Sequence, residues 1–221
     1  MGELVDMDTD AMNELEPVVE AASSIKSRGR PRLFDHDQAL DKALDVFWKR
    51  GYEGASLSEL TDALGINRPS LYAAFGNKEE LFRKALERYV AGPVAYASAA
   101  LQQPTARKVV ETFLTDSASL LTDPKTPHGC MLVQGALTCG EDAQAVSRLL
   151  ADCRNNFQDA LRLRLERAKL DGDLPASADA AGLARYVATI HQGMSVQGTS
   201  GATHDELLGV IATVMANWPS A

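Results

Sequence analysis

The stretch from Leu57 to Glu80, LSELTDALGINRPSLYAAFGNKEE, constrains the fold more than any other part of the chain. Its apolar residues recur at intervals of three and four, which predicts two short amphipathic helices followed by the start of a third. Gly65 stands between the two helices, where a sharp turn favours a residue that tolerates positive φ. Helices this short bury little surface alone, and one common use of such a pair is to place the second helix in the major groove of DNA.

Residues with capping chemistry mark where these helices begin. Asn67 is a good N-cap for the second helix, and Pro69 lies in its first turn, where a missing N–H costs little. Two pairs have the spacing of a capping box, Ser56 with Glu59 and Asn77 with Glu80.

The second helix presents a small, polar face with one cation. With Leu71 and Phe75 taken as buried and about 100° per residue, the outward residues are Arg68, Pro69, Ser70, Tyr72 and Ala73. Arg68 can donate two hydrogen bonds to a guanine, and Tyr72 can donate to a phosphate. Lys78 can reach a phosphate together with free backbone N–H groups at the next helix start. A solvated helix pair without a partner is the alternative that spacing alone leaves open.

A longer run of residues carries a family resemblance. The segments GRPR (29–32) and FDHDQALDKALDVFWKRGYEGASLSELTDALGINRPSLYAAFGNKEELF (34–82) closely resemble the DNA-binding domain of TetR/AcrR-type transcriptional regulators, without a gap. The specific pieces are Arg-Gly-Tyr at 50–52, Gly-Ile at 65–66 and Leu-Tyr-x-x-Phe-x-x-Lys-Glu-x-Leu from residue 71.

The resemblance implies an all-α fold of about nine helices. Three of them would form a helix-turn-helix DNA-binding domain over 28–80, with a basic N-terminal arm. The others would form a helical effector-binding and dimerisation domain over 81–221, and residues 1–27 would precede both as an acidic tail. Ser56, Tyr72 and Lys78 would then lie on phosphates and Arg68, Ser70 and Ala73 near bases, with Asn67 and Pro69 beside them.

The net charge of −8 over 221 residues is unusual for a DNA-binding protein. Residues 1–25 carry −7, residues 26–90 carry +2 and residues 91–221 carry −3. The candidate DNA-binding part is therefore the only positive segment. Because it is only mildly basic, its affinity for DNA is expected to depend on a few well-placed cations. These are Arg28, Arg30, Arg32, Arg68 and Lys78.

The N-terminal residues divide into an acidic and a basic part. Residues 1–25 are acidic with few aromatics, which predicts disorder. A tail without a specific role is favoured over an intramolecular competitor for the basic arm or a mis-assigned start codon. Residues 26–33, KSRGRPRL, resemble arms that lie in the DNA minor groove, with a solvated linker as the alternative.

The rest of the chain predicts helices throughout. Asp35 caps a first helix that ends at about Arg50, before Gly51. A long helix is expected from residue 77 to about 100, kinked or broken at Gly92-Pro93, either as a hinge or as a passive boundary. Further helices are expected over 105–122, 130–139, 141–171, 177–198 and 204–218, the last with a capping box at Thr203 and Glu206.

The resemblance also implies a small-molecule site among the C-terminal helices. Candidate lining residues are Tyr89, Tyr96, Phe113, Leu114, Met131, Val133, Gln134, Phe157, His191, Gln192 and Met194. His191 and Gln192 stand out because two hydrogen-bonding side chains in an otherwise small and aliphatic helix need partners. A core or interface hydrogen bond is the competing interpretation of that pair, and ordinary core packing is that of the others.

Contacts between two copies of the chain are expected on the last two helices, where apolar residues lie on more than one side. In the family the corresponding helices pair with their copies as a four-helix bundle. Such a dimer presents two reading helices to half-sites about one DNA turn apart, or somewhat more. The candidates are Ala184, Val187, Ala188, His191, Leu207, Leu208, Ile211, Val214 and Met215.

Enzymatic, cofactor and metal sites are not expected. The four histidines lack a recognisable metal spacing, and no G-x-S-x-G or paired carboxylates stand out. Cys130, Cys139 and Cys153 lack a C-x-x-C spacing, so a reduced, cytoplasmic compartment is expected, and inert thiols are favoured over a redox switch. No membrane segment is expected, because no apolar run approaches 18 residues.

The leading hypothesis is a transcriptional repressor. Its homodimer would hold a palindromic double-stranded operator until a small-molecule effector favours a different spacing of the two heads. An effector-independent DNA-binding or architectural protein, or an activator, with the same head is the alternative.

Overall fold

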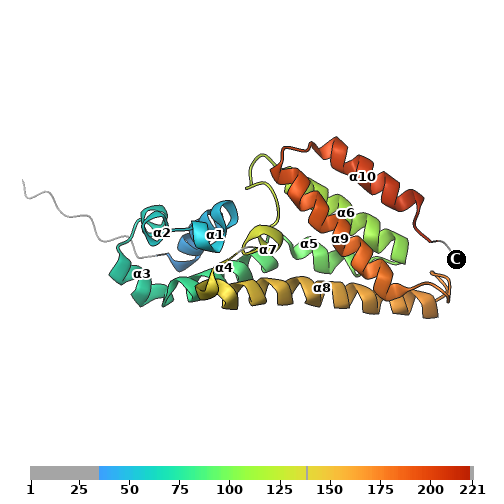
Figure 1. Cartoon of the computed structure of the whole chain (residues 1–221), viewed down its shortest axis with the longest axis horizontal. Helices are drawn as coiled ribbons and strands as arrows, with labels where there is room; N and C mark the ends of the chain where they lie inside the picture. Colours follow the sequence, from blue (N-terminus) through green and yellow to red (C-terminus); the bar gives the residue numbers. More distant parts are fainter. Residues whose placement is uncertain (1–34, 138, 220–221) are drawn as a thin grey trace, which may run out of the picture. The chain divides into compact units, whose positions relative to one another are not determined.

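All regular elements in the described part of the chain are helical, which confirms the all-α prediction (Figure 1). The computed structural model describes residues 35–137 and 139–219, so the acidic tail and Arg28, Arg30 and Arg32 lie outside it. Ten α-helices and one 3-10 helix follow in the order α1 (His36–Gly54), α2 (Leu57–Leu64), α3 (Arg68–Phe75), α4 (Lys78–Ala91), α5 (Ala95–Ala100), α6 (Ala106–Leu121), α7 (Met131–Gln134), η1 (Glu141–Ala143), α8 (Gln144–Leu170), α9 (Ala180–Thr199) and α10 (His204–Ala216).

The predicted caps hold the helix starts in place. Asn67 Oδ1 accepts a hydrogen bond from the Ser70 N–H at 2.9 Å, and Ser56 Oγ accepts one from the Glu59 N–H at 3.1 Å. The Ser56 box is only half formed, because the Glu59 carboxylate pairs with Arg50 at 3.1 Å. Complete capping boxes form at Asn77 with Glu80 and at Thr203 with Glu206.

The first helix packs chiefly on α4 through its buried side chains. Phe47 lies edge-on to Phe82, with ring centroids 5.0 Å apart. Gly51 interrupts α1 with a φ of 69°, as the sequence predicts. On the exposed side, Arg88 of α4 pairs with Asp37 and Asp41 of α1, so ion pairs as well as apolar contacts join the two helices.

The long helix expected from 77 to 100 is broken into α4 and α5. Pro93 has no N–H to continue the helical ladder, and Gly92 leaves helical geometry with φ −112° and ψ −94°. This break accounts for ten α-helices in place of the nine predicted.

The helix expected over 130–139 is much shorter in the structure, where α7 has four residues. Its flanks serve contacts with α1 instead of a longer helix. The Tyr52 N–H donates to the Gly135 carbonyl at 3.0 Å, and the Gly140 N–H donates to Glu53 Oε1 at 2.8 Å.

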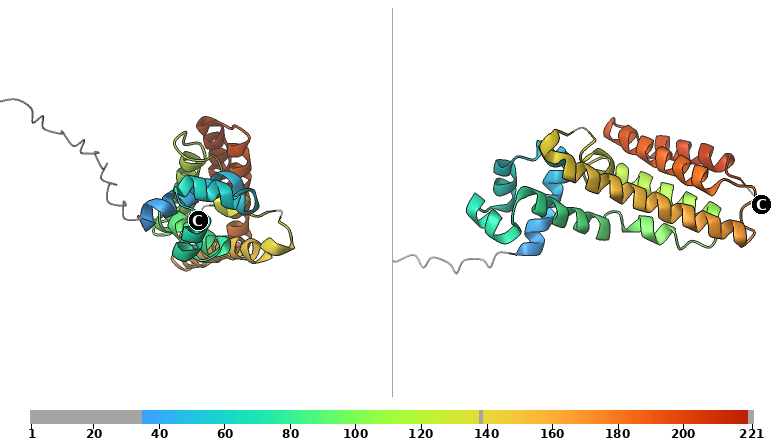
Figure 2. Two further views of the ribbon diagram at one scale, coloured as in Figure 1. Left: turned by 90° about the vertical axis from the view of Figure 1, so that its left-hand side faces the viewer. Right: turned by 60° about the horizontal axis from the view of Figure 1, so that its bottom comes forward.

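The remaining helices match their predicted ranges closely and pack on one another. The long α8 packs against α9, and α6 contacts both α9 and α10. Figures 1 and 2 show α9 and α10 side by side. None of the helices in the described ranges is long and apolar enough to span a bilayer. Buried side chains form a continuous core from α1 to Trp218.

Candidate functional site

The helix pair α2–α3 has the predicted turn and the predicted buried face. Gly65 adopts a left-handed conformation with φ 71°, which reverses the chain between the helices. Leu60 and Leu71 have no exposed surface, and Phe75 is 2% exposed. The burial of these residues fixes which side of α3 faces outward.

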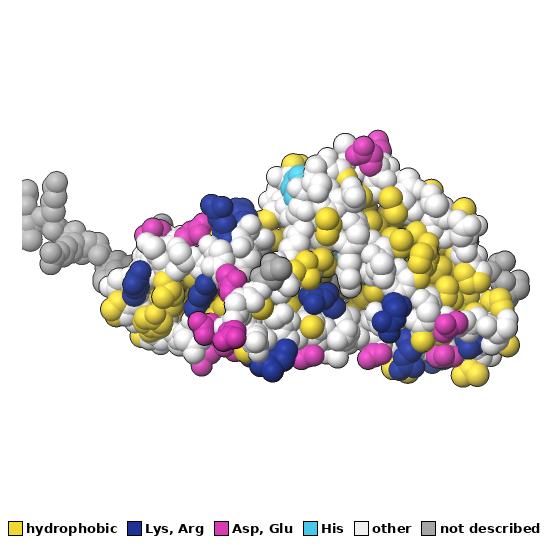
Figure 3. Space-filling model, in the orientation of Figure 1, with side chains coloured by type: hydrophobic (Ala, Val, Ile, Leu, Met, Phe, Trp, Pro, Cys, Tyr) yellow, Lys and Arg dark blue, Asp and Glu magenta, His cyan; other side chains and the backbone are white. Residues whose placement is uncertain are grey.

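The outward face of α3 consists of the residues expected to meet DNA. Arg68, Pro69, Ser70, Tyr72 and Ala73 are all exposed, and Tyr72 is 46% exposed. Figure 3 shows hydrophobic side chains with a basic one beside them at the position of α3. Within the described ranges Arg68 and the Tyr72 hydroxyl form no hydrogen bond or ion pair, so their donors are available to a partner.

Three further candidates, Ser56, Asn67 and Lys78, are held in place by the protein itself. Ser56 and Asn67 accept the capping bonds described above, which leaves the Ser56 hydroxyl hydrogen and the Asn67 amide N–H groups as donors. Lys78 lies over the ring of Tyr52, with 4.5 Å between Nζ and the ring centroid. Partial burial lowers the pKa of Lys78, and the nearby Glu53 carboxylate opposes that shift.

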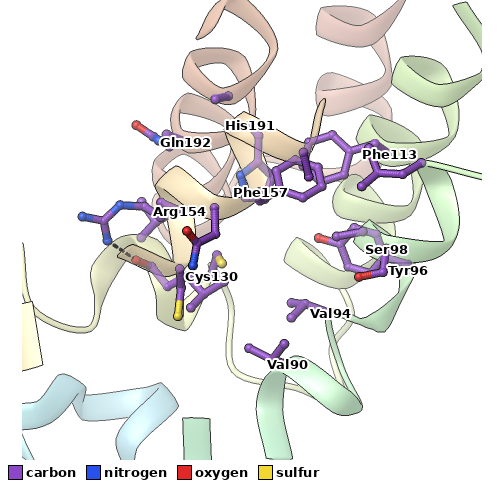
Figure 4. Close-up of a pocket in the computed structure, with 18 residues that line it drawn as sticks. Val90, Val94, Tyr96, Ser98, Phe113, Cys130, Arg154, Phe157, His191 and Gln192 are labelled. Atoms are coloured by element: carbon purple, nitrogen blue, oxygen red, sulfur yellow. Dashed lines mark hydrogen bonds between the residues drawn. The ribbon is translucent and has the colours of Figure 1, made fainter. Parts of the chain in front are cut away.

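A cavity of about 350 Å³ lies among α4, α5, α6, α7, α8 and α9 (Figure 4). Its volume is within the range of small-molecule sites, roughly 300–1,000 Å³. The predicted residues that line it are Tyr96, Phe113, Val133, Phe157, His191 and Gln192.

Aromatic rings form one wall of the cavity. The Phe113 ring lies 4.5 Å from that of Phe157 and 5.1 Å from that of His191. Tyr96 lies further along, 6.1 Å from Phe113, and its hydroxyl accepts a hydrogen bond from Ser117 Oγ at 3.1 Å. This wall suits a flat or flexible apolar group.

His191 brings an unpaired polar atom to this wall. The side chain as a whole is partly exposed, but Nε2 is buried and has no hydrogen-bond partner among the described residues. Burial lowers the pKa of His191 to about 4, so its imidazole is neutral near pH 7. A buried nitrogen without a partner is unusual in a core and common where a ligand or water binds.

Five of the predicted lining residues lie elsewhere in the core: Tyr89, Leu114, Met131, Gln134 and Met194. The Tyr89 hydroxyl donates to Cys130 Sγ at 3.5 Å and accepts from the Met131 N–H at 3.3 Å. Gln134 Nε2 donates to Thr199 Oγ1 at 3.1 Å and to the Ser195 carbonyl at 3.4 Å. The polar groups of Tyr89 and Gln134 thus have hydrogen-bond partners within the protein.

The cavity also contains residues that the sequence predictions missed. Arg154 and Asn156 of α8 contribute polar groups, and Cys130, Leu132 and Cys153 complete that side. Arg154 Nη1 donates to the Leu132 carbonyl, the dashed line in Figure 4. Burial raises the pKa of the Cys130 thiol, although Tyr89 and the Val133 N–H favour its thiolate.

The residues predicted for a dimer interface mostly face the interior of their own chain. Ala184, Val187, Ala188, Leu207, Ile211, Val214 and Met215 are buried without any second copy, and His191 and Leu208 are partly buried. The exposed side of the same two helices is therefore the one available to a partner. Tyr186, Val196 and Val210 are 43%, 48% and 39% exposed there. Figure 3 shows hydrophobic side chains gathered over the region of α9 and α10.

No cluster of three or more His, Cys, Asp or Glu side chains suited to a metal ion occurs among residues 35–137 and 139–219. The three cysteines are free thiols.

Two stretches of the chain match known protein families. Residues 39–85 match the family of bacterial regulatory proteins named after tetR, and residues 104–199 match a tetracycline repressor-like C-terminal domain. The chain is 35% identical over 196 residues to the HTH-type transcriptional repressor ComR of Escherichia coli K12, covering 88% of this chain and 93% of ComR. It is 30% identical to the repressor BdcR of the same organism, covering 83% of this chain and 89% of BdcR.

Solved structures agree with the sequence comparison. A cysteine mutant of the TetR family regulator CifR, complexed with 26-base-pair operator DNA, is 43% identical to this chain. The match covers 86% of this chain and all of that one, with a TM-score of 0.83. The match thus extends over most of the chain, and the chain belongs to the TetR family of bacterial transcriptional regulators.

Proposed function

We propose that this protein is a transcriptional repressor that holds operator DNA with α3 and releases it when a small molecule fills the cavity. The observation that carries the proposal is the exposed face of α3, whose donors have no partner in the described chain while its opposite face is fully buried. CifR, with a similar fold, is bound to operator DNA, and ComR and BdcR are repressors. We expect a repressor that binds operator DNA to act in the bacterial cytoplasm.

The α3 contacts divide into base readout and phosphate positioning. Arg68 and Ser70 suit base edges, and Ala73 allows close approach in the major groove. Tyr72, Ser56 and Lys78 suit phosphates, with the Lys78 ammonium held at the α4 N-terminus by the Tyr52 ring. Arg28, Arg30 and Arg32 are proposed for the minor groove and lie outside the described residues.

One head can read only one half-site, so a palindromic operator requires two copies. We propose that they meet through the exposed sides of α9 and α10, at Tyr186, Val196 and Val210. This face replaces the buried residues named from the sequence.

Effector release requires a connection between the cavity and the head. Cys130, Leu132 and Val133 line the cavity and belong to the segment 129–140, which hydrogen-bonds to α1. An effector that displaces this segment changes the orientation of α1 and therefore of α3. The cavity, and the His191 Nε2 that has no hydrogen-bond partner among the described residues, favour this responsive repressor over an effector-independent DNA-binding protein.

The test is a mobility-shift titration against the DNA upstream of the protein's own gene, at several salt concentrations. We expect a sequence-specific complex below micromolar protein whose affinity falls steeply with salt. Binding that scrambled DNA of the same length competes for equally well contradicts operator recognition.

A further inference from the structure

We propose that the cavity selects an anionic amphipathic molecule, a carboxylate on an aromatic or aliphatic body, and that Arg154 binds its carboxylate. This inference rests on the proposed function only in taking the cavity as the effector site, and it adds the chemical class of the effector.

The charge of the cavity is the first argument. Arg154 is the only Asp, Glu, Lys or Arg among the described lining residues. Its guanidinium has five N–H donors, and its one hydrogen bond within the described chain goes to the Leu132 carbonyl. No ion pair joins Arg154 to a carboxylate in the same residues, whereas Arg162 and Arg167 of α8 each have one. A ligand carboxylate would satisfy donors that the protein leaves open.

The remaining lining describes the rest of the molecule. Phe113, Phe157 and Tyr96 offer apolar surface, and Val90 and Val94 extend it on the α4–α5 side (Figure 4). His191 Nε2 is buried at the same wall without a partner in the described ranges, which is a second mark of a site built for a ligand. Because the His191 imidazole is neutral near pH 7, it adds no positive charge, and Arg154 alone decides the preference for an anion.

The competing interpretation is that Arg154 only anchors α7 through the Leu132 carbonyl. That role needs a single donor and predicts no preference between a charged and a neutral ligand of equal shape. The two interpretations therefore differ in ligand selectivity, which can be measured without an identified effector.

The experiment compares 4-phenylbutanoate with 4-phenylbutanamide, which share size and shape and differ in charge. Binding to the full-length protein is measured by calorimetry and by the rise in melting temperature. We expect the carboxylate to bind at least about tenfold more tightly than the amide, the effect of a charge-assisted hydrogen bond. Arg154→Gln should bring the two affinities within about threefold of each other. Arg154→Lys should keep a preference for the carboxylate.

The matched control is Arg148→Gln, which removes the same charge from an exposed position on α8 outside the cavity. It should leave the selectivity unchanged. Equal affinities in the unmodified protein, binding of neither ligand, or a preference that survives Arg154→Gln overturns the proposal. Operator binding by the ligand-free protein is measured in parallel, because its loss would sink the proposed repressor function and leave the ligand selectivity standing.

Discussion

The indole N–H of Trp48 donates a hydrogen bond to the carbonyl of Gly129 across 2.9 Å, in the interior of the protein. It joins α1 of the DNA-binding head to the loop that enters α7. Further along both segments, the Tyr52 N–H donates to the Gly135 carbonyl and the Glu53 carboxylate accepts from the Gly140 N–H. The wall of the cavity is thus tied to α1 at three points along one short segment.

Trp48→Phe should weaken this connection and the fold together. Phenylalanine keeps most of the buried ring but leaves the Gly129 carbonyl without its donor, which costs about 1–3 kcal/mol. Urea unfolding should show that loss as a lower free energy of unfolding. The matched control is Trp218→Phe, because Trp218 is also buried but its Nε1 has no partner among the described residues. Equal losses in the two variants would contradict a specific role for the Trp48 bond.

Gly129→Ala should destabilise the same loop by two effects. Gly129 has a φ of 87°, and an added Cβ would clash with the side chains of Gln134 and Thr199. Gly172 has a similar φ of 77° but open space around its Cβ position, so Gly172→Ala measures the backbone effect alone, about 1–2 kcal/mol. Gly129→Ala should lower the free energy of unfolding by roughly 1–3 kcal/mol more than Gly172→Ala does, because the added methyl group overpacks the site. The difference is read from the two unfolding free energies.

Local chemistry explains why so much of the fold was predictable. The caps at Asn67, Asn77 and Thr203 act within three residues, and the buried face of α3 follows from the spacing of Leu71 and Phe75. The length of α7 was not predictable, because its backbone bonds α1 some 80 residues earlier in the chain.

Only the structure shows which side of each C-terminal helix is buried. The apolar residues of α9 and α10 were more numerous than one face requires, and the sequence could not say which of them face the core. The position of Arg154 in the cavity could have been predicted from the sequence. It stands at helical spacing between Leu150 and Phe157, which face inward, so a charged residue interrupts a buried stripe.

Tyr72→Ala should abolish operator binding while the fold and the cavity persist. The side chain is 46% exposed and has no partner in the described chain, so its loss should change stability by less than about 0.5 kcal/mol. Fluorescence anisotropy with the operator measures the dissociation constant. Tyr72→Phe keeps the ring and removes only the phosphate donor. Its dissociation constant should therefore lie between those of the unmodified protein and of Tyr72→Ala. An unchanged dissociation constant for Tyr72→Ala would show that this placement is wrong.

Val196→Glu should convert the proposed dimer to monomers. Val196 is 48% exposed on the free side of α9, and a carboxylate there would have to be buried without a partner when two copies meet. Light scattering after size exclusion gives the mass at micromolar concentration. Leu163→Glu is the control, since Leu163 is 60% exposed on α8 and is not part of the proposed α9–α10 face. Loss of the dimer in both variants, or in neither, would exclude the α9–α10 face.

His191 should make the protein less stable as the pH falls below about 6.5. Its pKa is about 4 in the folded chain because of burial, against an ordinary value of 6.5, so the unfolded chain binds the proton more tightly. Between pH 6.5 and 4 this lowers the unfolding free energy by about 1.4 kcal/mol for each pH unit, and outside that window the effect is constant. His191→Gln should remove this part of the slope in urea titrations at stepped pH. His128→Gln, which replaces a histidine at an exposed position, is the control variant. If His191→Gln keeps that slope as well, the imidazole is not buried in its neutral form and the cavity wall is more hydrated than the structure indicates.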